Sequence, residues 1–129
     1  MKIRLTLSII FLGIFLAFSG PVLSQGDGGA IKKMSMIMMH LNHFPSDKDK
    51  EWLRKLAGDS SQSAHIRTIA TAMANLQHRA MGEDKAKLMQ VIDDGSASAD
   101  VKDLARIIHD LSHQPSSADR KRLGEMAGM

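Results

Sequence analysis

The sequence predicts an all-α fold made of three helical-hairpin repeats of 35 residues, six helices in total, after an N-terminal signal peptide. Similar residues recur every 35 positions without any gap, which is typical of stacked supersecondary units. Within each unit, apolar residues follow helical spacing, and no segment alternates apolar and polar residues as a strand does. The repeated positions include Leu41, Leu76 and Leu111; His43, His78 and His113; Leu53, Leu88 and Leu123; Asp49, Asp84 and Asp119.

Residues 1–24 have the layout of a secretory signal peptide. Lys2 and Arg4 precede an apolar run of 14 residues, Leu5 to Phe18, and small side chains lead to a cleavage point after Ser24. The run is shorter than the roughly 20 residues of a membrane helix, so we expect no stable membrane span after cleavage. The sequence therefore predicts a periplasmic or secreted protein.

Residues 25–129 are expected to form one domain with a modest core. The full chain has 17 Lys and Arg against 14 Asp and Glu, and removing Lys2 and Arg4 leaves 15 against 14, a net charge of +1. A near-neutral chain with interspersed signs does not favour nucleic-acid binding. The absence of cysteine excludes a lipid anchor on cysteine, disulfides and thiolate metal sites.

Each repeat, at about residues 29–63, 64–98 and 99–129, is expected to contain a longer and a shorter helix. The longer helices present one apolar stripe to the core. Its residues are Ile31, Met34, Met38 and Leu41; Ile66, Ile69, Met73 and Leu76; Val101, Leu104, Ile108 and Leu111. The shorter helices carry Leu53 and Leu56, Leu88 and Val91, Leu123 and Met126. The units form either a small solenoid or a compact bundle.

Turn residues mark where the helices begin. Ser46 and Ser116 each follow a proline and precede an acid by three positions, which is an N-cap signal, whereas the middle unit starts more weakly at Met81 and Gly82. Serines also precede the second and third longer helices. Gly26 to Gly29 is expected to be a flexible lead-in, and the two aromatic residues of the mature chain, Phe44 and Trp52, are expected in the core of the first unit.

The repeated histidines His43, His78 and His113 stand at the ends of the longer helices. A histidine there can satisfy terminal carbonyl groups and favour the negative end of the helix dipole, which is the more common role. The alternative is a shared metal site. In a solenoid, helices about 8–10 Å apart would arrange the three imidazoles in a row and not around one ion, whereas a closed bundle would relax that objection.

A stripe of thioethers and imidazoles marks the first helix. Met36 and His40, and Met39 and His43, are each four residues apart and hence neighbours on its outer face. Thioethers suit Cu(I), and imidazoles suit copper or zinc, so these four residues form a candidate metal site. His109 and His113 form a second such pair.

The leading functional hypothesis is a non-enzymatic interaction or adaptor module of the cell envelope. Helical repeats build extended surfaces for a partner protein or peptide, and methionine suits adaptable contacts. No nucleophile motif, phosphate loop or catalytic constellation is present in the sequence. The candidate partner-binding residues lie on the outer faces of the longer helices: Met36, Met39, His40, Thr71, Asn75, Arg106 and His109. A copper- or zinc-binding envelope protein is the alternative.

Overall fold

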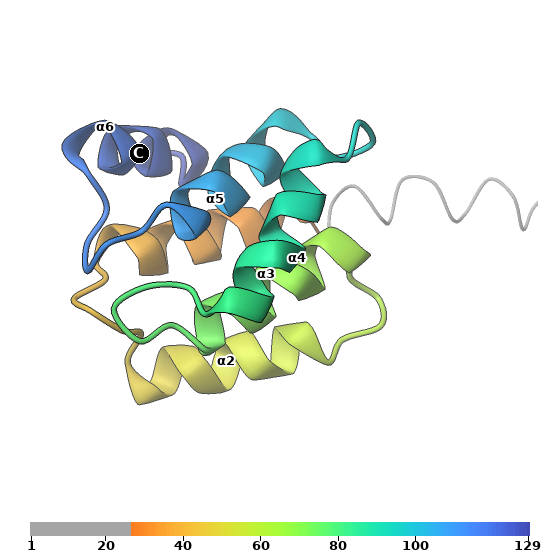
Figure 1. The fold of residues 1–129 in the computed structure, drawn as a ribbon, viewed down its shortest axis with the longest axis horizontal. Coiled ribbons are helices and arrows are strands. Elements are labelled where there is room, and N and C mark those ends of the chain that lie inside the picture. Colours follow the sequence, from red (N-terminus) through yellow and green to blue (C-terminus); the bar gives the residue numbers. More distant parts are fainter. Residues whose placement is uncertain (1–26) are drawn as a thin grey trace, which may run out of the picture.

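The computed structural model describes residues 27–129, and this part of the chain consists of helices joined by loops (Figure 1). Within it lie six helices and no strand, which confirms the predicted all-α class. The helices are residues 27–39, α2 (Asp47–Ala57), α3 (Ala64–Ala74), α4 (Gly82–Asp93), α5 (Ala99–His109) and α6 (Ser117–Met126). The predicted signal peptide and its cleavage point after Ser24 lie outside the described residues.

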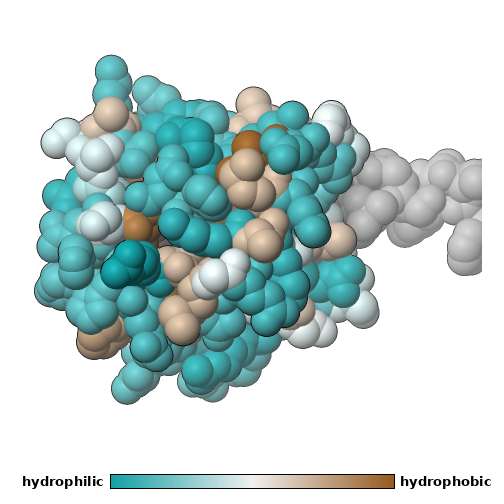
Figure 2. Space-filling model, viewed as in Figure 1, coloured by the Kyte–Doolittle hydropathy of each residue, from teal (hydrophilic) through white to brown (hydrophobic). Residues whose placement is uncertain are grey.

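The helices pack compactly around one apolar core. The largest fully buried side chains come from all six helices and from one connecting loop. They are Met34, Met38, Leu53, Ile66, Ile69, Met73, Leu76, Leu88, Leu104, Ile107, Ile108 and Leu123. The face shown in Figure 2 is mostly hydrophilic, with separate apolar spots. Among residues 27–129, no helix is both long enough and apolar enough to cross a membrane.

The last helix of the chain returns to the first. A Cβ added to Gly124 of α6 would lie 3.8 Å from the Cε atom of Met39, and one added to Gly128 would lie 3.9 Å from the Lys32 side chain. In the interior of the chain, α2 packs on α3 and α4 packs on α5. The structure thus shows a compact bundle, one of the two arrangements that the sequence left open.

Serine side chains begin four of the helices, as predicted. Ser46, Ser63, Ser98 and Ser116 each accept a hydrogen bond from the backbone N–H three residues later, at 3.1–3.3 Å. These bonds satisfy one of the otherwise unpaired N–H groups of a helix N-terminus. Met81 precedes α4 without a side-chain cap, which confirms the weaker start of the middle unit.

Three local expectations were wrong. Phe44 is 52% exposed, because it follows a left-handed turn at His43 and its ring lies beneath the Lys50 ammonium rather than in the core. Gly28 and Gly29 belong to the first helix instead of a flexible lead-in. The helices also end before Leu41, Leu76 and Leu111, which are buried in the segments that follow. Trp52 is partly buried against the core, with Lys33 over its ring.

Candidate metal centre

Three loops place the repeated histidines at one end of the bundle. The loops follow the first helix, α3 and α5, and they gather on the left of Figure 1. His43, His78 and His113 have φ angles of 74°, 71° and 69°, and within residues 27–129 they are the only non-glycine residues with positive φ. Such a backbone is uncommon for an L-residue, although histidine tolerates it better than most. Each loop therefore turns sharply at its histidine.

A closed ring of backbone hydrogen bonds joins the three loops. The N–H of His78 donates to the carbonyl oxygen of His43 at 2.9 Å, and the N–H of His113 donates to that of His78 at 2.7 Å. The N–H of His43 completes the ring by donating to the carbonyl oxygen of His113 at 3.3 Å. Because the ring uses main-chain groups alone, it holds the three loops together independently of the orientation of the imidazoles.

The three imidazoles turn their Nδ1 atoms toward one another. Nδ1 of His43 lies 3.2 Å from that of His78 and 3.3 Å from that of His113, and the His78–His113 separation is 3.3 Å. The rings are inclined to one another by 64–83°, so they meet edge to face and do not stack. The expected role of these side chains as caps of helix carbonyls is therefore wrong: the Nδ1 atoms meet each other instead.

Hydrogen bonding alone cannot satisfy this triangle. Each Nδ1 carries either one proton or one in-plane lone pair, and never both. A single N–H···N hydrogen bond can join two of the Nδ1 atoms. The third Nδ1 atom then faces them without a hydrogen bond. A cation at the centre would instead accept all three lone pairs. The arrangement therefore has the donor chemistry of a metal site.

The size of the triangle fits a first-row metal ion. A tetrahedral zinc ion with Zn–N bonds of about 2.0–2.1 Å separates its nitrogen ligands by about 3.4 Å. The observed separations of 3.2–3.3 Å match that value. These three residues also form the one cluster of at least three His, Asp or Glu ligand groups found within the described residues. His43 is half-buried, and His78 and His113 are exposed, so solvent reaches the site.

The four residues of the predicted Met and His stripe on the first helix lie in different surroundings. Met36 is 42% exposed, and the imidazole Nδ1 of His40 lies 3.0 Å from the Met36 carbonyl oxygen. Met39 lies against Gly124 of α6, whereas His43 belongs to the histidine triangle. The predicted pair in the last unit also separates, because His109 Nδ1 lies 2.7 Å from Asp110 Oδ1 while His113 faces the other two histidines.

The predicted partner-binding residues do not form one surface feature. Met36 and His40 line a shallow groove together with Lys32, Lys33 and Ile37. Three other predicted residues contact groups within the protein. Thr71 donates to the carbonyl oxygen of Arg67 at 2.9 Å, Asn75 donates to the Asp84 carboxylate at 3.1 Å, and Arg106 lies 3.6 Å from the Asp119 carboxylate.

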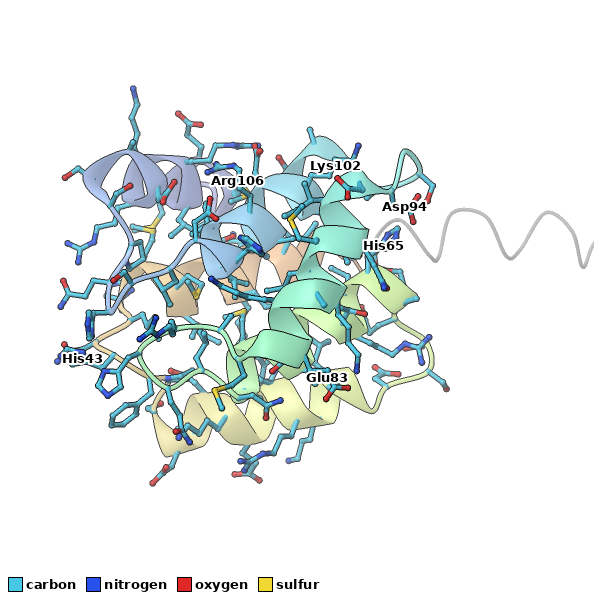
Figure 3. All side chains as sticks on the ribbon, in the orientation of Figure 1. His43, His65, Glu83, Asp94, Lys102 and Arg106 are labelled. Carbon is cyan, nitrogen blue, oxygen red and sulfur yellow. The ribbon has the colours of Figure 1, made fainter. Side chains whose placement is uncertain are left out.

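A second histidine contact lies at the opposite end of the molecule. His65 Nε2 is 2.7 Å from the Asp94 carboxylate, and Figure 3 shows this pair far from His43. The pKa of Asp94 is lowered to about 2 by hydrogen bonds from the backbone and hydroxyl of Ser96, and by the His65 bond. One carboxylate and one imidazole make a hydrogen bond between α3 and the loop after α4, not a metal cluster.

Comparisons with protein-family models, with curated proteins and with solved structures found no match for this chain. The site therefore has to be interpreted from its own geometry. The sequence analysis gave His43, His78 and His113 as an alternative shared metal site, second to a capping role, and its list of metal ligands contained His43 and His113 but lacked His78. The 35-residue repeat supplied the signal for all three residues, and closure of the bundle removes the geometric objection to the shared site.

Proposed function

We propose that this protein binds a divalent metal ion, zinc, through His43, His78 and His113. The observation that carries this proposal is the convergence of three Nδ1 atoms to within 3.2–3.3 Å of one another. No hydrogen-bond pattern satisfies that triangle, and the spacing matches three ligands of one tetrahedral ion. The three loops come from well-separated parts of the chain, so the ion would also join them.

Zinc fits this ligand set better than copper(I). Three imidazole nitrogens suit zinc, whereas copper(I) favours soft sulfur ligands. The thioethers that prompted the copper hypothesis lie in different environments: Met36 lines a groove with Lys32, Lys33 and Asp49, whereas Met39 lies against Gly124. Two separated thioethers do not form one soft site of the kind that copper(I) favours.

We further propose that the protein is exported and is built from three related helical hairpins. The signal-like residues 1–24 support a periplasmic or secreted location, and the 35-residue spacing supports three related helical hairpins. The equal φ angles of the three histidines agree with that repetition. We assign the protein a metal-binding role in the envelope, with the three histidines at an exposed end of the bundle.

A protein-interaction role is the second candidate, and one observation favours it. The groove beside the first helix exposes Met36 next to Lys32 and Lys33, and a flexible thioether there suits contact with a partner protein or peptide. Replacing the exposed Met36 by serine should abolish capture of such a partner without unfolding the protein. Capture that survives this substitution would count against this surface.

Calorimetric titration with zinc tests the leading proposal. The purified protein should bind one zinc ion per chain, and His78→Asn should lose that binding. Asparagine tolerates a positive φ, so this variant keeps the turn and removes only the imidazole. His109→Asn and the double variant Met36→Ser, His40→Gln should bind zinc like the parent, because these three residues are outside the triangle and Met36 and His40 are exposed. Zinc binding that persists in His78→Asn, or is lost in the double variant, would refute the assignment.

A further inference from the structure

We propose that the metal ion in the three-histidine site binds a carboxylate group as its fourth ligand. The inference rests on the proposed function and extends it to the chemistry of the partner ligand. Two features support it: an incomplete set of protein ligands at an exposed site, and cationic side chains on or beside the residues that follow the three histidines.

The coordination sphere has room for one more ligand. Zinc in proteins is almost always four-coordinate, and His43, His78 and His113 supply three nitrogens. No other His, Asp or Glu of residues 27–129 belongs to this cluster. A ligand from outside the protein can therefore complete the coordination of the ion.

The charge of the site favours an anion. Neutral imidazoles leave the ion its full double positive charge, which a carboxylate partly neutralises. Zinc accepts carboxylate oxygens at about 2.0–2.2 Å, within its ordinary range of ligands. Because His78 and His113 are exposed, a carboxylate from solution or from a peptide side chain can reach the ion.

Three cationic residues lie on or beside the residues that directly follow the site histidines, and we call Lys50, Arg79 and Arg120 the basic rim. Lys50 and Arg120 each contact such a residue. Lys50 Nζ lies 5.1 Å above the ring of Phe44, and Arg120 Nη2 donates to Gln114 Oε1 at 2.9 Å. Arg79 itself follows His78 in an exposed loop.

Nearby acids have other partners. The carboxylate of Asp49 accepts a hydrogen bond from the Ser46 hydroxyl at 2.9 Å, and that of Asp119 lies 3.6 Å from Arg106. Neither carboxylate is part of the ligand cluster. The guanidinium groups of Arg79 and Arg120 match the two oxygens of a carboxylate in shape and charge.

Cobalt(II) substitution provides the test, because its visible spectrum reports changes in coordination. We expect acetate to alter the spectrum of the cobalt-loaded protein at constant ionic strength, with saturation at one acetate per ion. Acetamide, a neutral molecule of the same shape, should leave the spectrum unchanged. A short capped peptide with one glutamate distinguishes a peptide carboxylate from a free acid: tighter binding than acetate identifies a peptide source, and equal binding identifies a free carboxylate, both within the proposal.

Variants of the basic rim test its contribution. Arg120→Gln and Lys50→Gln should each weaken acetate binding by about fivefold, as expected for removing one nearby charge in a solvated site. Lys102→Gln removes the same charge far from His43, as Figure 3 shows, and should leave the affinity unchanged. The cobalt affinity itself should not fall in any of these variants.

Two results would overturn the inference while leaving the proposed function intact. The first is a cobalt-loaded, His78-dependent site whose spectrum does not respond to acetate. The second is an equal response to acetate and acetamide. A protein that fails to bind cobalt and zinc at all would instead remove both proposals. Phosphate that displaces acetate with much higher affinity would also contradict the assignment to carboxylates.

Discussion

His43 and His78 meet twice, once through the backbone and once through the side chains. The His78 N–H donates to the His43 carbonyl oxygen at 2.9 Å, and the two Nδ1 atoms are 3.2 Å apart. The backbone bond holds the two loops together independently of any ion, so the imidazoles are placed before metal binding. Preorganisation of this kind lowers the entropic cost of assembling a site from distant parts of a chain.

Zinc should stabilise the folded protein. At a free zinc concentration 100-fold above Kd, binding to the native state alone adds about 2.7 kcal/mol to the free energy of unfolding. For a domain of this size we expect the Tm to rise by about 10 °C or more. Differential scanning calorimetry with and without a chelator measures the shift, which should vanish in His78→Asn. An equal shift in that variant would place the ion elsewhere.

Substitutions at His78 should separate its backbone role from its role as a ligand. A left-handed backbone costs an L-residue about 1–2 kcal/mol, and glycine avoids that cost. Without metal, we expect His78→Gly to be about as stable as the parent, and His78→Val to be less stable because its side chain is β-branched. Chemical denaturation in chelator measures both. Neither variant should bind zinc.

Ser35→Ala should stabilise the core. Ser35 is fully buried, and its hydroxyl has no hydrogen-bond partner within residues 27–129, whereas Ala70 and Ala105 occupy positions 35 and 70 residues later with equal burial. Removing an unsatisfied buried hydroxyl should raise the free energy of unfolding by about 1 kcal/mol. Urea titration measures this change. A loss of stability would show that the hydroxyl is satisfied in solution.

Gly124→Ala should strengthen the contact between α6 and the first helix. The added Cβ would lie 3.8 Å from Cε and 3.9 Å from Sδ of Met39, which is ordinary van der Waals contact. Alanine in a helix interior is about 0.5–1 kcal/mol more favourable than glycine. We expect a gain of that size in thermal unfolding. Destabilisation would mean that the two helices pack more closely than this geometry.

Asp94→Asn should reduce stability at neutral pH but not in strong acid. The Ser96 and His65 hydrogen bonds lower the Asp94 pKa to about 2, from an ordinary value of 3.8. A lowered carboxyl pKa stabilises the folded state above the unfolded-state value and loses that contribution as pH falls through about 2. The difference between parent and variant in urea midpoint should therefore be largest above pH 4 and shrink toward pH 2. A constant difference across that range would contradict this account.

The local features of this fold were readable from the sequence. Helical spacing of apolar residues predicted the helices around Leu53 and Ile66, and the serine signals located Ser46 and Ser116 as N-caps. These features depend on contacts within a few residues. Phe44 was misjudged for the opposite reason: its exposure follows from the left-handed turn at His43, and side-chain type alone does not reveal that turn.

The sequence by itself determined the helical class, the helix starts and the presence of three histidines at equal spacing, because propensity, capping and periodicity act over short stretches of chain. Only the tertiary structure decided where those histidines lie in relation to one another. An open row of hairpins would keep them apart, whereas closure of the bundle brings His113 back to His43 through a backbone hydrogen bond. That contact joins residues far apart in the chain, and packing of α6 against the first helix makes it possible.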